Sequence, residues 1–295
     1  MEYTLNNKEL IVKINSLGAE LTSVVQADTG RQMLWQADPA VWGRHAPLLF
    51  PWAGNLRDKK FTWQGTSYAG GQHGFARDLE FALVSHTQER LELVLRSDAQ
   101  TRERFPFDFA LHSIFTLQGR TLTHTVQVEA CGQQELRFGV GFHPGFACPF
   151  DDAHQLKDYE FRFDAPQSPV VIQTDANTGL VTGRQWPLEE EPIQAIPVQQ
   201  EMFDNDSICL SQLTAKTISI MEKDTGRSVE LGIQGVPYVL LWSKAGVPLR
   251  YLCVEPWHCL PDTETASGNW AEKPCTAQLA PGESWQTSLP ITFHW

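Results

Sequence analysis

The chain has 295 residues, 42% of them hydrophobic and 11% aromatic, which is enough for one large domain or two smaller ones around a sizeable core. With 23 basic and 35 acidic residues, its formal net charge of −12 repels nucleic-acid phosphates and anionic lipid headgroups. The N-terminal stretch has neither the basic start nor the apolar centre of a secretory signal, and no apolar run approaches the roughly 20 residues that span a bilayer. We therefore expect a cytoplasmic protein with no nucleic-acid or membrane partner.

Short extended runs alternate with turn residues along the whole chain, as in a meander of β-hairpins. Turns are expected at residues 118–119 and 224–226, each between two extended runs. The spacing predicts strands at residues 10–14, 21–25, 33–35, 81–84, 91–95, 111–117, 122–128, 218–221, 229–233, 239–242, 251–254 and 284–293.

One short helix is expected at residues 98–104, capped by Ser97 or Asp98 and ending before Pro106. The acidic, proline-containing segment 186–198 is predicted to be a surface loop. Because similar extended runs lie on both sides of it, we predict an all-β protein with few short helices and a single domain over residues 1–295.

The six cysteines are far apart and form no C-x-x-C pair, so neither a zinc knuckle nor a disulfide scaffold is expected. Cys209 and Cys253 lie in apolar runs and are predicted to be small core residues.

The most informative stretch is residues 249–260, where an apolar run carries Glu255 directly before Pro256 and Trp257. Because proline cannot donate to a ladder, pairing is expected to stop just after Glu255, so that the acid emerges at a strand end. A carboxylate surrounded by apolar groups has a raised pKa and is a candidate base. The alternative is an acid that caps a loop or pairs with Arg250.

Two histidines lie in glycine-rich and aromatic surroundings. His73 lies between Gly71 and Gly74, with Arg77 shortly after it, and His143 precedes Pro144. Proline biases the preceding backbone to an extended form, which orients His143 as a candidate proton donor. A tight turn with a half-exposed histidine is the alternative for His73.

Residues 47–61 contain two prolines and a glycine, followed by Asn55 and Arg57. On an extended backbone these two polar side chains would share one face and could bind a ligand. The segment could equally be an ordinary loop.

Two histidines and a glutamate are a common metal-ligand set, but His73 and His143 are 70 residues apart and no short H-x-H or H-x-x-x-H pair occurs. We therefore expect no bound metal. A nucleophilic serine elbow and a glycine-rich phosphate loop are also absent from the sequence.

Five motifs in a fixed order resemble the aldose 1-epimerase (galactose mutarotase) family, and most closely its LacX-like branch. The motifs are Phe-Pro-Trp-Ala-Gly at 50–54, His-Gly-Phe-Ala-Arg at 73–77, Gly-Phe-His-Pro-Gly-Phe at 141–146, Phe-Asp-Asn-Asp at 203–206 and Cys-Val-Glu-Pro-Trp at 253–257. The resemblance extends from about residue 20 to about residue 290. It implies a β-supersandwich fold, no cofactor, and interconversion of the α and β anomers of a free aldose.

The resemblance also implies roles for individual residues. Glu255 would be the base that removes the proton of the anomeric hydroxyl, and His143 the acid that protonates the ring oxygen. His73 would hold or polarise that oxygen, while Arg77 and Asp206 would bind sugar hydroxyls.

In one respect the chain departs from the family, which usually has an arginine where Asn55 stands. Arg57 would replace it as a sugar contact, if the two share a strand face. Asp204 is an alternative to Asp206 within the matching motif. Trp257 and Trp52 could stack on a pyranose ring, although tryptophan in an all-β protein is more often a core residue.

Three functions remain open from the sequence: an aldose 1-epimerase, a hexose-6-phosphate 1-epimerase, and a non-catalytic sugar-binding protein of the same fold. A phosphate would need clustered cations, and the chain offers Arg57, Arg77 and Lys59-Lys60. A glycosidase would need a second carboxylate about 5–10 Å from Glu255, for which only Asp262 and Glu264 lie close in sequence. The preferred sugar, and whether the protein is a monomer or a homodimer, are not determined by the sequence.

Overall fold

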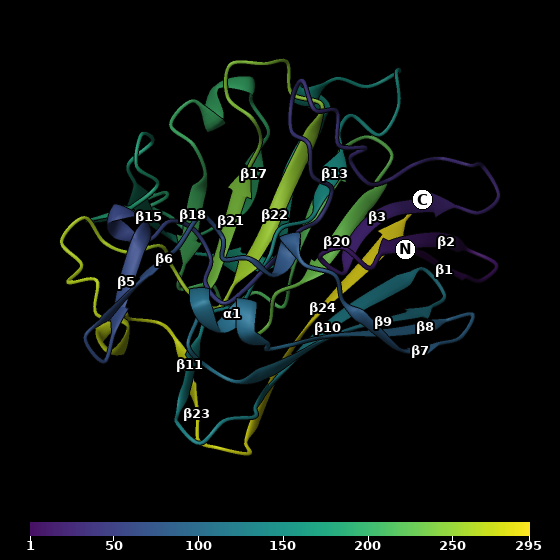
Figure 1. Ribbon diagram of the computed structural model, residues 1–295. Helices are drawn as coiled ribbons and strands as arrows, with labels where there is room; N and C mark the ends of the chain where they lie inside the picture. The colour runs from purple at the N-terminus through teal and green to yellow at the C-terminus, as the bar shows by residue number, and fades with distance from the viewer.

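The computed structural model describes every residue from Met1 to Trp295. Two large antiparallel sheets, one of nine strands and one of eight, make up most of it (Figure 1). A core of 60 buried residues draws on the facing sides of both sheets. The predicted all-β class with few short helices is confirmed. None of the helices combines the length and apolar character needed to cross a membrane.

The strand order in each sheet is as follows. The nine-stranded sheet consists of β17 (Ile193–Pro197), β14 (Tyr159–Gln167), β19 (Thr217–Glu222), β20 (Ser228–Gly232), β24 (Ser284–His294), β10 (Thr121–Ala130), β9 (Phe109–Gln118), β8 (Arg90–Arg96) and β7 (Ala82–His86). The eight-stranded sheet consists of β16 (Val181–Pro187), β15 (Val170–Thr174), β18 (Ile208–Ser211), β21 (Tyr238–Trp242), β22 (Tyr251–Trp257), β12 (Gly141–Phe142) and β4 (Leu48–Leu49), with β13 (Gly145–Ala147) also paired to β22.

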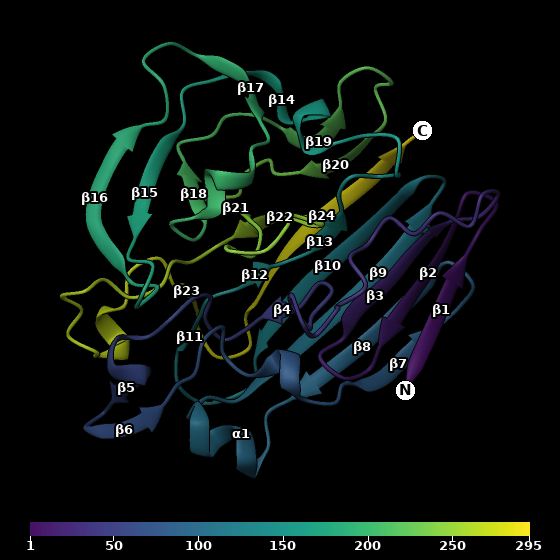
Figure 2. The same cartoon turned by 90° about the horizontal axis from the view of Figure 1, so that it is seen from above.

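Smaller elements surround these sheets. The strands β1 (Glu2–Asn6), β2 (Leu10–Asn15) and β3 (Glu20–Gln26) form a third sheet, which lies beside β7 and β8 in both views (Figure 1, Figure 2). Two-stranded sheets are formed by β5 (Lys60–Trp63) with β6 (Thr66–Ala69), and by β11 (Leu136–Phe138) with β23 (Ala277–Leu279). The helical elements are α1 (Ala99–Arg104) and five single 3-10 turns, η1 (Arg57–Lys59), η2 (Ala76–Asp78), η3 (Leu156–Asp158), η4 (Gln200–Phe203) and η5 (Trp270–Glu272).

Local sequence signals account for several of these elements. The β9–β10 and β19–β20 hairpins turn where predicted. The helix α1 begins where expected, because the Asp98 side chain accepts a hydrogen bond of 2.8 Å from the backbone N–H of Thr101, and the Thr101 hydroxyl in turn accepts one from the backbone of Asp98.

Two expected segments are different in the structure. Residues 33–35 take part only in isolated bridges and form no strand. The predicted loop at 186–198 is partly wrong, since it contains the end of β16 and all of β17, and only residues 188–192 cross between the two sheets. Both strands lie at sheet edges, where prolines and charges are tolerated.

The strand β22 has two different faces. Leu252 and Val254 belong to the core between the sheets, while the alternate residues Cys253 and Glu255 point to the opposite side of the eight-stranded sheet. The whole strand is buried, so this outer side is itself covered by other parts of the chain. Glu255 is thus held in the middle of the sheet, facing away from the core.

The expected end of pairing after Glu255 is wrong, because Pro256 pairs with Val239 and Trp257 with Tyr238 on β21. The N–H of His258 donates to Val140, on the opposite side from β21. Backbone N–H groups alternate in direction along a strand, so the nitrogen of Pro256 also faces away from β21. By the register of Gly141 with Trp257, Pro256 lies opposite Phe142 at the end of β12, where the ladder between β12 and β22 stops.

Candidate active site

A cleft of about 340 Å³ opens on the outer side of the eight-stranded sheet. Its walls carry three indoles, those of Trp42, Trp242 and Trp257, and its floor includes Leu240 and Glu255. Ligand pockets are typically about 300–1,000 Å³, so this cleft suits a small molecule. Indole walls with a few polar groups are typical of a site for a sugar ring.

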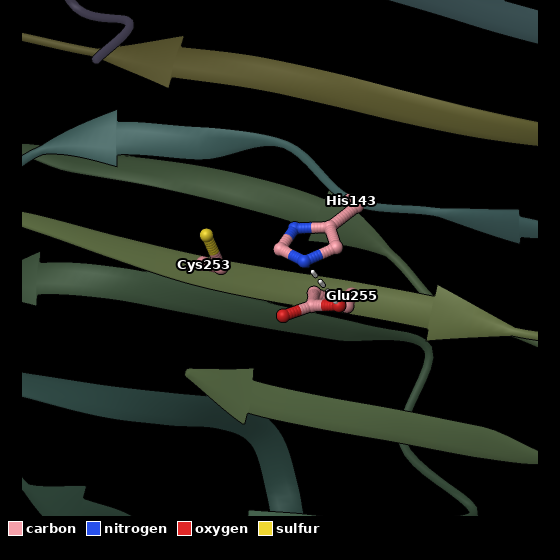
Figure 3. A group of neighbouring side chains, drawn as sticks. All are labelled: His143, Cys253 and Glu255. Atoms are coloured by element: carbon pink, nitrogen blue, oxygen red, sulfur yellow. Dashed lines mark ion pairs between the residues drawn. The ribbon is translucent and has the colours of Figure 1, made fainter. Parts of the chain in front are cut away.

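His143 lies directly opposite Glu255. Gly145 pairs with Cys253 and Gly141 with Trp257, and the same register continued through the break between β13 and β12 places position 143 against position 255. The Nε2 of His143 is 3.3 Å from Oε2 of Glu255 (Figure 3). Both side chains are more than nine-tenths buried and both line the cleft. Residues more than 100 positions apart are thus joined by strand register.

His73 completes a group of three side chains. Its ring centroid is 5.6 Å from that of His143 and 5.5 Å from that of Trp257, in edge-to-face geometry in both cases. The backbone N–H of Gly54 donates to Nδ1 of His73 at 2.9 Å. This hydrogen bond requires a lone pair on Nδ1, so a neutral His73 carries its proton on Nε2 and is a hydrogen-bond donor.

Burial controls the protonation of these groups. Desolvation, and then the nearby charge of Asp206, raise the pKa of Glu255 well above its ordinary value. Desolvation lowers the pKa of His143 to about 3 and lowers the pKa of His73 well below its usual range. The pair Glu255–His143 therefore favours its neutral form, a carboxylic acid beside an imidazole, when no sugar is bound.

Asp206 lies in the cleft and Asp204 does not. Asp206 Oδ1 accepts a hydrogen bond of 3.1 Å from Nε1 of Trp242, and burial raises its pKa. Its φ of 74° and the φ of 64° at His73 are unusual for residues with a side chain. Backbone strain of this kind is typical of functional sites.

Arg77 also lines the cleft. Its NH2 donates to the carbonyl of Gln72 at 2.9 Å, while its own carbonyl accepts a hydrogen bond from Arg44. The Nε of Arg77 is buried and has no partner in the protein. An unused donor on a fixed guanidinium is suited to an oxygen-rich ligand.

The expected common strand face of Asn55 and Arg57 does not form. Arg57 begins the 3-10 turn η1 instead of continuing an extended strand, and its NH1 donates to the carbonyl of Ala266. Asn55 donates to the carbonyl of Thr178 at 2.9 Å. Both residues line a neighbouring hollow and not the cleft with Glu255. Neither residue is thus among those that line the cleft with Glu255, and their contact with a sugar stays a prediction.

The tryptophans divide between core and cleft. Trp52 is 1% exposed and packs against Phe61 and Trp270, so the core interpretation holds for it. Trp257 lines the cleft, as expected. Sequence reasoning missed Trp42, which stacks on His143 at 4.9 Å, and Trp242; the position of Trp242 after an apolar strand run was the only available signal.

Two groups of side chains could hold a metal ion. One consists of the cleft residues His143 and Glu255 together with Cys253, which is fully buried next to the cleft, and the other of Asp151, His154 and Glu222. In the second group Arg227 is hydrogen-bonded to both carboxylates, so its guanidinium already occupies the place of a cation. The free thiol of Cys253 distinguishes the first group.

The family model described as aldose 1-epimerase matches residues 1–292. The chain therefore belongs to the aldose 1-epimerase family, as its motifs predicted.

Individual relatives agree with this assignment. The chain is 27% identical over 300 residues to the chromosomal protein LacX of Lactococcus lactis subsp. lactis, covering 99% of both chains. It is 31% identical over 271 residues to the uncharacterized protein YphB of Escherichia coli strain K12, covering 84% of this chain and 83% of the other.

Solved structures show the same fold. A galactose mutarotase related enzyme from Lactobacillus acidophilus superimposes with a TM-score of 0.94 at 30% identity, covering 100% of this chain and 98% of the other. A galactose mutarotase-like protein from Lactobacillus casei ATCC 334 gives a TM-score of 0.93 at 24% identity and full coverage of both chains. The expected galactose mutarotase-like β-supersandwich is thus confirmed.

Proposed function

We propose that this protein is an aldose 1-epimerase, which interconverts the α and β anomers of a free aldose by acid/base ring opening and closure. The observation that carries the proposal is the distance of 3.3 Å between His143 Nε2 and Glu255 Oε2 inside a cleft of sugar size. Mutarotation needs one group that accepts a proton and one that donates it. This pair offers both.

In the proposed reaction, Glu255 takes the proton of the anomeric hydroxyl while His143 gives a proton to the ring oxygen, and the C1–O5 bond breaks. The aldehyde rotates about C1–C2, and the ring closes on its other face with both proton transfers reversed. Before ring opening, the proton of the Glu255 carboxylic acid passes to Nε2 of His143, which is 3.3 Å from Oε2, and leaves a carboxylate beside an imidazolium. Ring opening then converts this ion pair back into a carboxylic acid and an imidazole. This neutral pair is the form that burial favours, which helps the pair accept the proton.

The other cleft residues have supporting roles in this proposal. His73 donates from Nε2 to the ring oxygen, since Gly54 occupies its Nδ1. Asp206 and Arg77 bind sugar hydroxyls, and Trp257 forms an apolar wall for the ring. No step requires a cofactor.

The test is the rate of anomer equilibration, followed by polarimetry or NMR with α-glucose, α-galactose and pentoses. We expect Glu255→Gln and His143→Asn each to lower the catalysed rate by about 10²–10⁴-fold, because each removes one proton-transfer group. Glu264→Gln is the matched control, since Glu264 is an exposed carboxylate outside the cleft. Wild-type activity in folded Glu255→Gln would refute the assignment. Saturable sugar binding without acceleration by the wild type would instead favour the sugar-binding alternative.

A second candidate, a hexose-6-phosphate 1-epimerase, is favoured by one observation. Lys244, which is exposed, lines the cleft together with Arg77. A phosphate at C6 would be attracted to these two cations. Comparing kcat/KM for glucose and glucose 6-phosphate, in the wild type and in Lys244→Ala, separates the two functions: only a phosphate-specific enzyme loses activity selectively on the phosphate.

A further inference from the structure

Cys253 is a buried thiol beside the Glu255–His143 pair and has no role in the proposed reaction. It lies two residues before Glu255 on β22, so both side chains project from the same face of the strand. One ligand atom each of His143, Cys253 and Glu255 lies within 4.8 Å of the other two (Figure 3). The three side chains are the only group in the cleft region that brings nitrogen, sulfur and oxygen donors together.

The donor set selects a particular class of cation. Thiolate and imidazole are preferred by Zn²⁺ and softer ions, whereas Mg²⁺ and Ca²⁺ require oxygen ligands. Three protein ligands with an open fourth position are typical of accessible zinc sites. Because His143 and Glu255 both line the cleft, the fourth position would face it and could hold water.

The electrostatics of the cleft also favour a cation at this place. Glu255 makes no ion pair with lysine or arginine, and the basic side chain it contacts is that of His143. Asp206 adds a second carboxylate to the same cleft. The Nδ1 of His143 is buried without a hydrogen-bond partner. A neutral His143 with its proton on Nδ1 presents the lone pair of Nε2 toward Glu255, where a cation would lie.

The geometry requires only a small adjustment. With bonds of about 2.0 Å to nitrogen and about 2.3 Å to sulfur at a tetrahedral ion, ligand atoms lie about 3.5 Å apart. His143 Nε2 and Glu255 Oε2 are already 3.3 Å apart. No two of the three ligand atoms are more than 4.8 Å apart. A pair at that distance would have to approach by about 1 Å, which rotation of the side chains can supply.

We propose that His143, Cys253 and Glu255 form a binding site for a soft or borderline divalent cation such as Zn²⁺ or Cd²⁺, and that occupation of this site inhibits the enzyme. Binding replaces the thiol proton of Cys253 by a metal–sulfur bond and the carboxyl proton of Glu255 by a metal–oxygen bond, and it releases both protons to solvent. The metal holds the base and the acid, so neither can exchange a proton with a sugar. Inhibition rests on the proposed epimerase function, whereas binding does not.

Co²⁺ provides a direct probe, because a cobalt–thiolate bond absorbs in the near ultraviolet. We expect this band when Co²⁺ is added to the wild-type protein, and we expect Zn²⁺ to abolish it. The exposed cysteines Cys131 and Cys275 could also bind cobalt, so the titration is repeated in Cys131→Ser/Cys275→Ser, where the band should remain. Cys253→Ala should lose it, while the matched control Cys148→Ala, which removes another buried thiol, should keep it.

Inhibition is measured on the same proteins. Zn²⁺ should inhibit the wild type and Cys148→Ala equally, and a chelator should restore both. Metal-free Cys253→Ala should retain activity but require at least about 100-fold more Zn²⁺ for inhibition, because loss of a direct ligand costs more than loss of a group that is hydrogen-bonded to a ligand. If Cys253→Ala fails to fold, Glu255→Gln replaces it in the cobalt titration alone.

Two results would overturn the proposal: a wild-type protein without a zinc-sensitive thiolate band, or equal zinc affinity in folded Cys253→Ala. The cobalt titration is independent of catalysis. A protein that binds cobalt through Cys253 but never accelerates mutarotation would refute the proposed function and leave the metal site standing.

Discussion

At the scale of single residues, the cleft contains ionisable side chains that are buried, and hydrogen bonds fix the orientation of two of them. Glu255 is 2% exposed and lacks a permanent cation as partner, a state that costs free energy unless the carboxyl is protonated. His73 is kept in one tautomer by the N–H of Gly54. Asp206 is oriented by the indole of Trp242. Gly54 belongs to the motif at 50–54, whereas Trp242 lies outside all five motifs.

The raised pKa of Glu255 predicts a pH-dependent stability difference for Glu255→Gln. The pKa of Glu255 is higher in the folded state than in the unfolded state. Its contribution to the free energy of unfolding is therefore fully present below the unfolded-state pKa and is lost as pH rises through the folded-state pKa. Glutamine does not titrate. We therefore expect Glu255→Gln to gain stability over the wild type between pH 4 and pH 8, by about 1.4 kcal/mol for each unit of pKa difference.

Urea unfolding of both proteins across this pH range measures the difference. A constant difference in unfolding free energy at all pH values would show that Glu255 is not desolvated. Glu264→Gln, at an exposed position, should show no such trend.

At the scale of elements, the site is built from a strand interior and two loops that approach it closely. Gly74, with a φ of +69°, lies against the backbone of Phe50, and a Cβ at this position would be only 2.1 Å from the Phe50 carbonyl oxygen. The N–H of Phe75 donates to this same carbonyl. The loop that carries His73 is thus fixed to the segment after β4 by direct backbone contact.

This contact predicts opposite outcomes for two glycines on either side of His73. Gly74→Ala should lower the free energy of unfolding by at least about 2 kcal/mol and reduce mutarotation, because the backbone must shift and carry His73 with it. Gly71→Ala is the control, since a Cβ there has no atom within 4 Å and its φ is not positive. Thermal unfolding and polarimetry measure both effects. Equal stability of the two variants would contradict this account of the loop.

At the scale of the whole molecule, one core of 60 buried residues lies between the two large sheets, and we propose on this basis that the chain is a single domain. A separate polar network links the nine-stranded sheet to the segment before β14. In this network the fully buried Glu222 is hydrogen-bonded to Tyr159, Thr225 and Arg227, and Arg227 also contacts Asp151. None of its members lines the cleft.

Removing Arg227 should therefore affect stability but not the catalytic step. Arg227→Met removes the arginine partner of the buried Glu222 and leaves it only His154 as a basic partner, whose Nδ1 is 3.4 Å away. Breaking a buried ion pair typically costs about 3–5 kcal/mol. Arg162→Met is the control, because Arg162 pairs with Glu160 and its side chain is 42% exposed. Such exposed pairs contribute about 0–1 kcal/mol. Urea unfolding measures both losses, and kcat of folded Arg227→Met should match the wild type. A large fall in kcat would show that the network reaches the cleft.

The sequence by itself determined the β-rich architecture, the hairpin turns, the capped helix and the ordered motifs that carry Glu255, His143 and His73. These features depend on local chemistry, namely alternation, turn residues and side-chain type, which a linear sequence contains. Only the tertiary structure decided that Pro256 continues the ladder, that Arg57 turns away from the cleft, and that Trp42 and Trp242 form its walls. These outcomes depend on which strand lies beside each backbone group and on which loop covers each side chain. Local sequence cannot decide them, because strand register and packing are set by residues far apart in the chain.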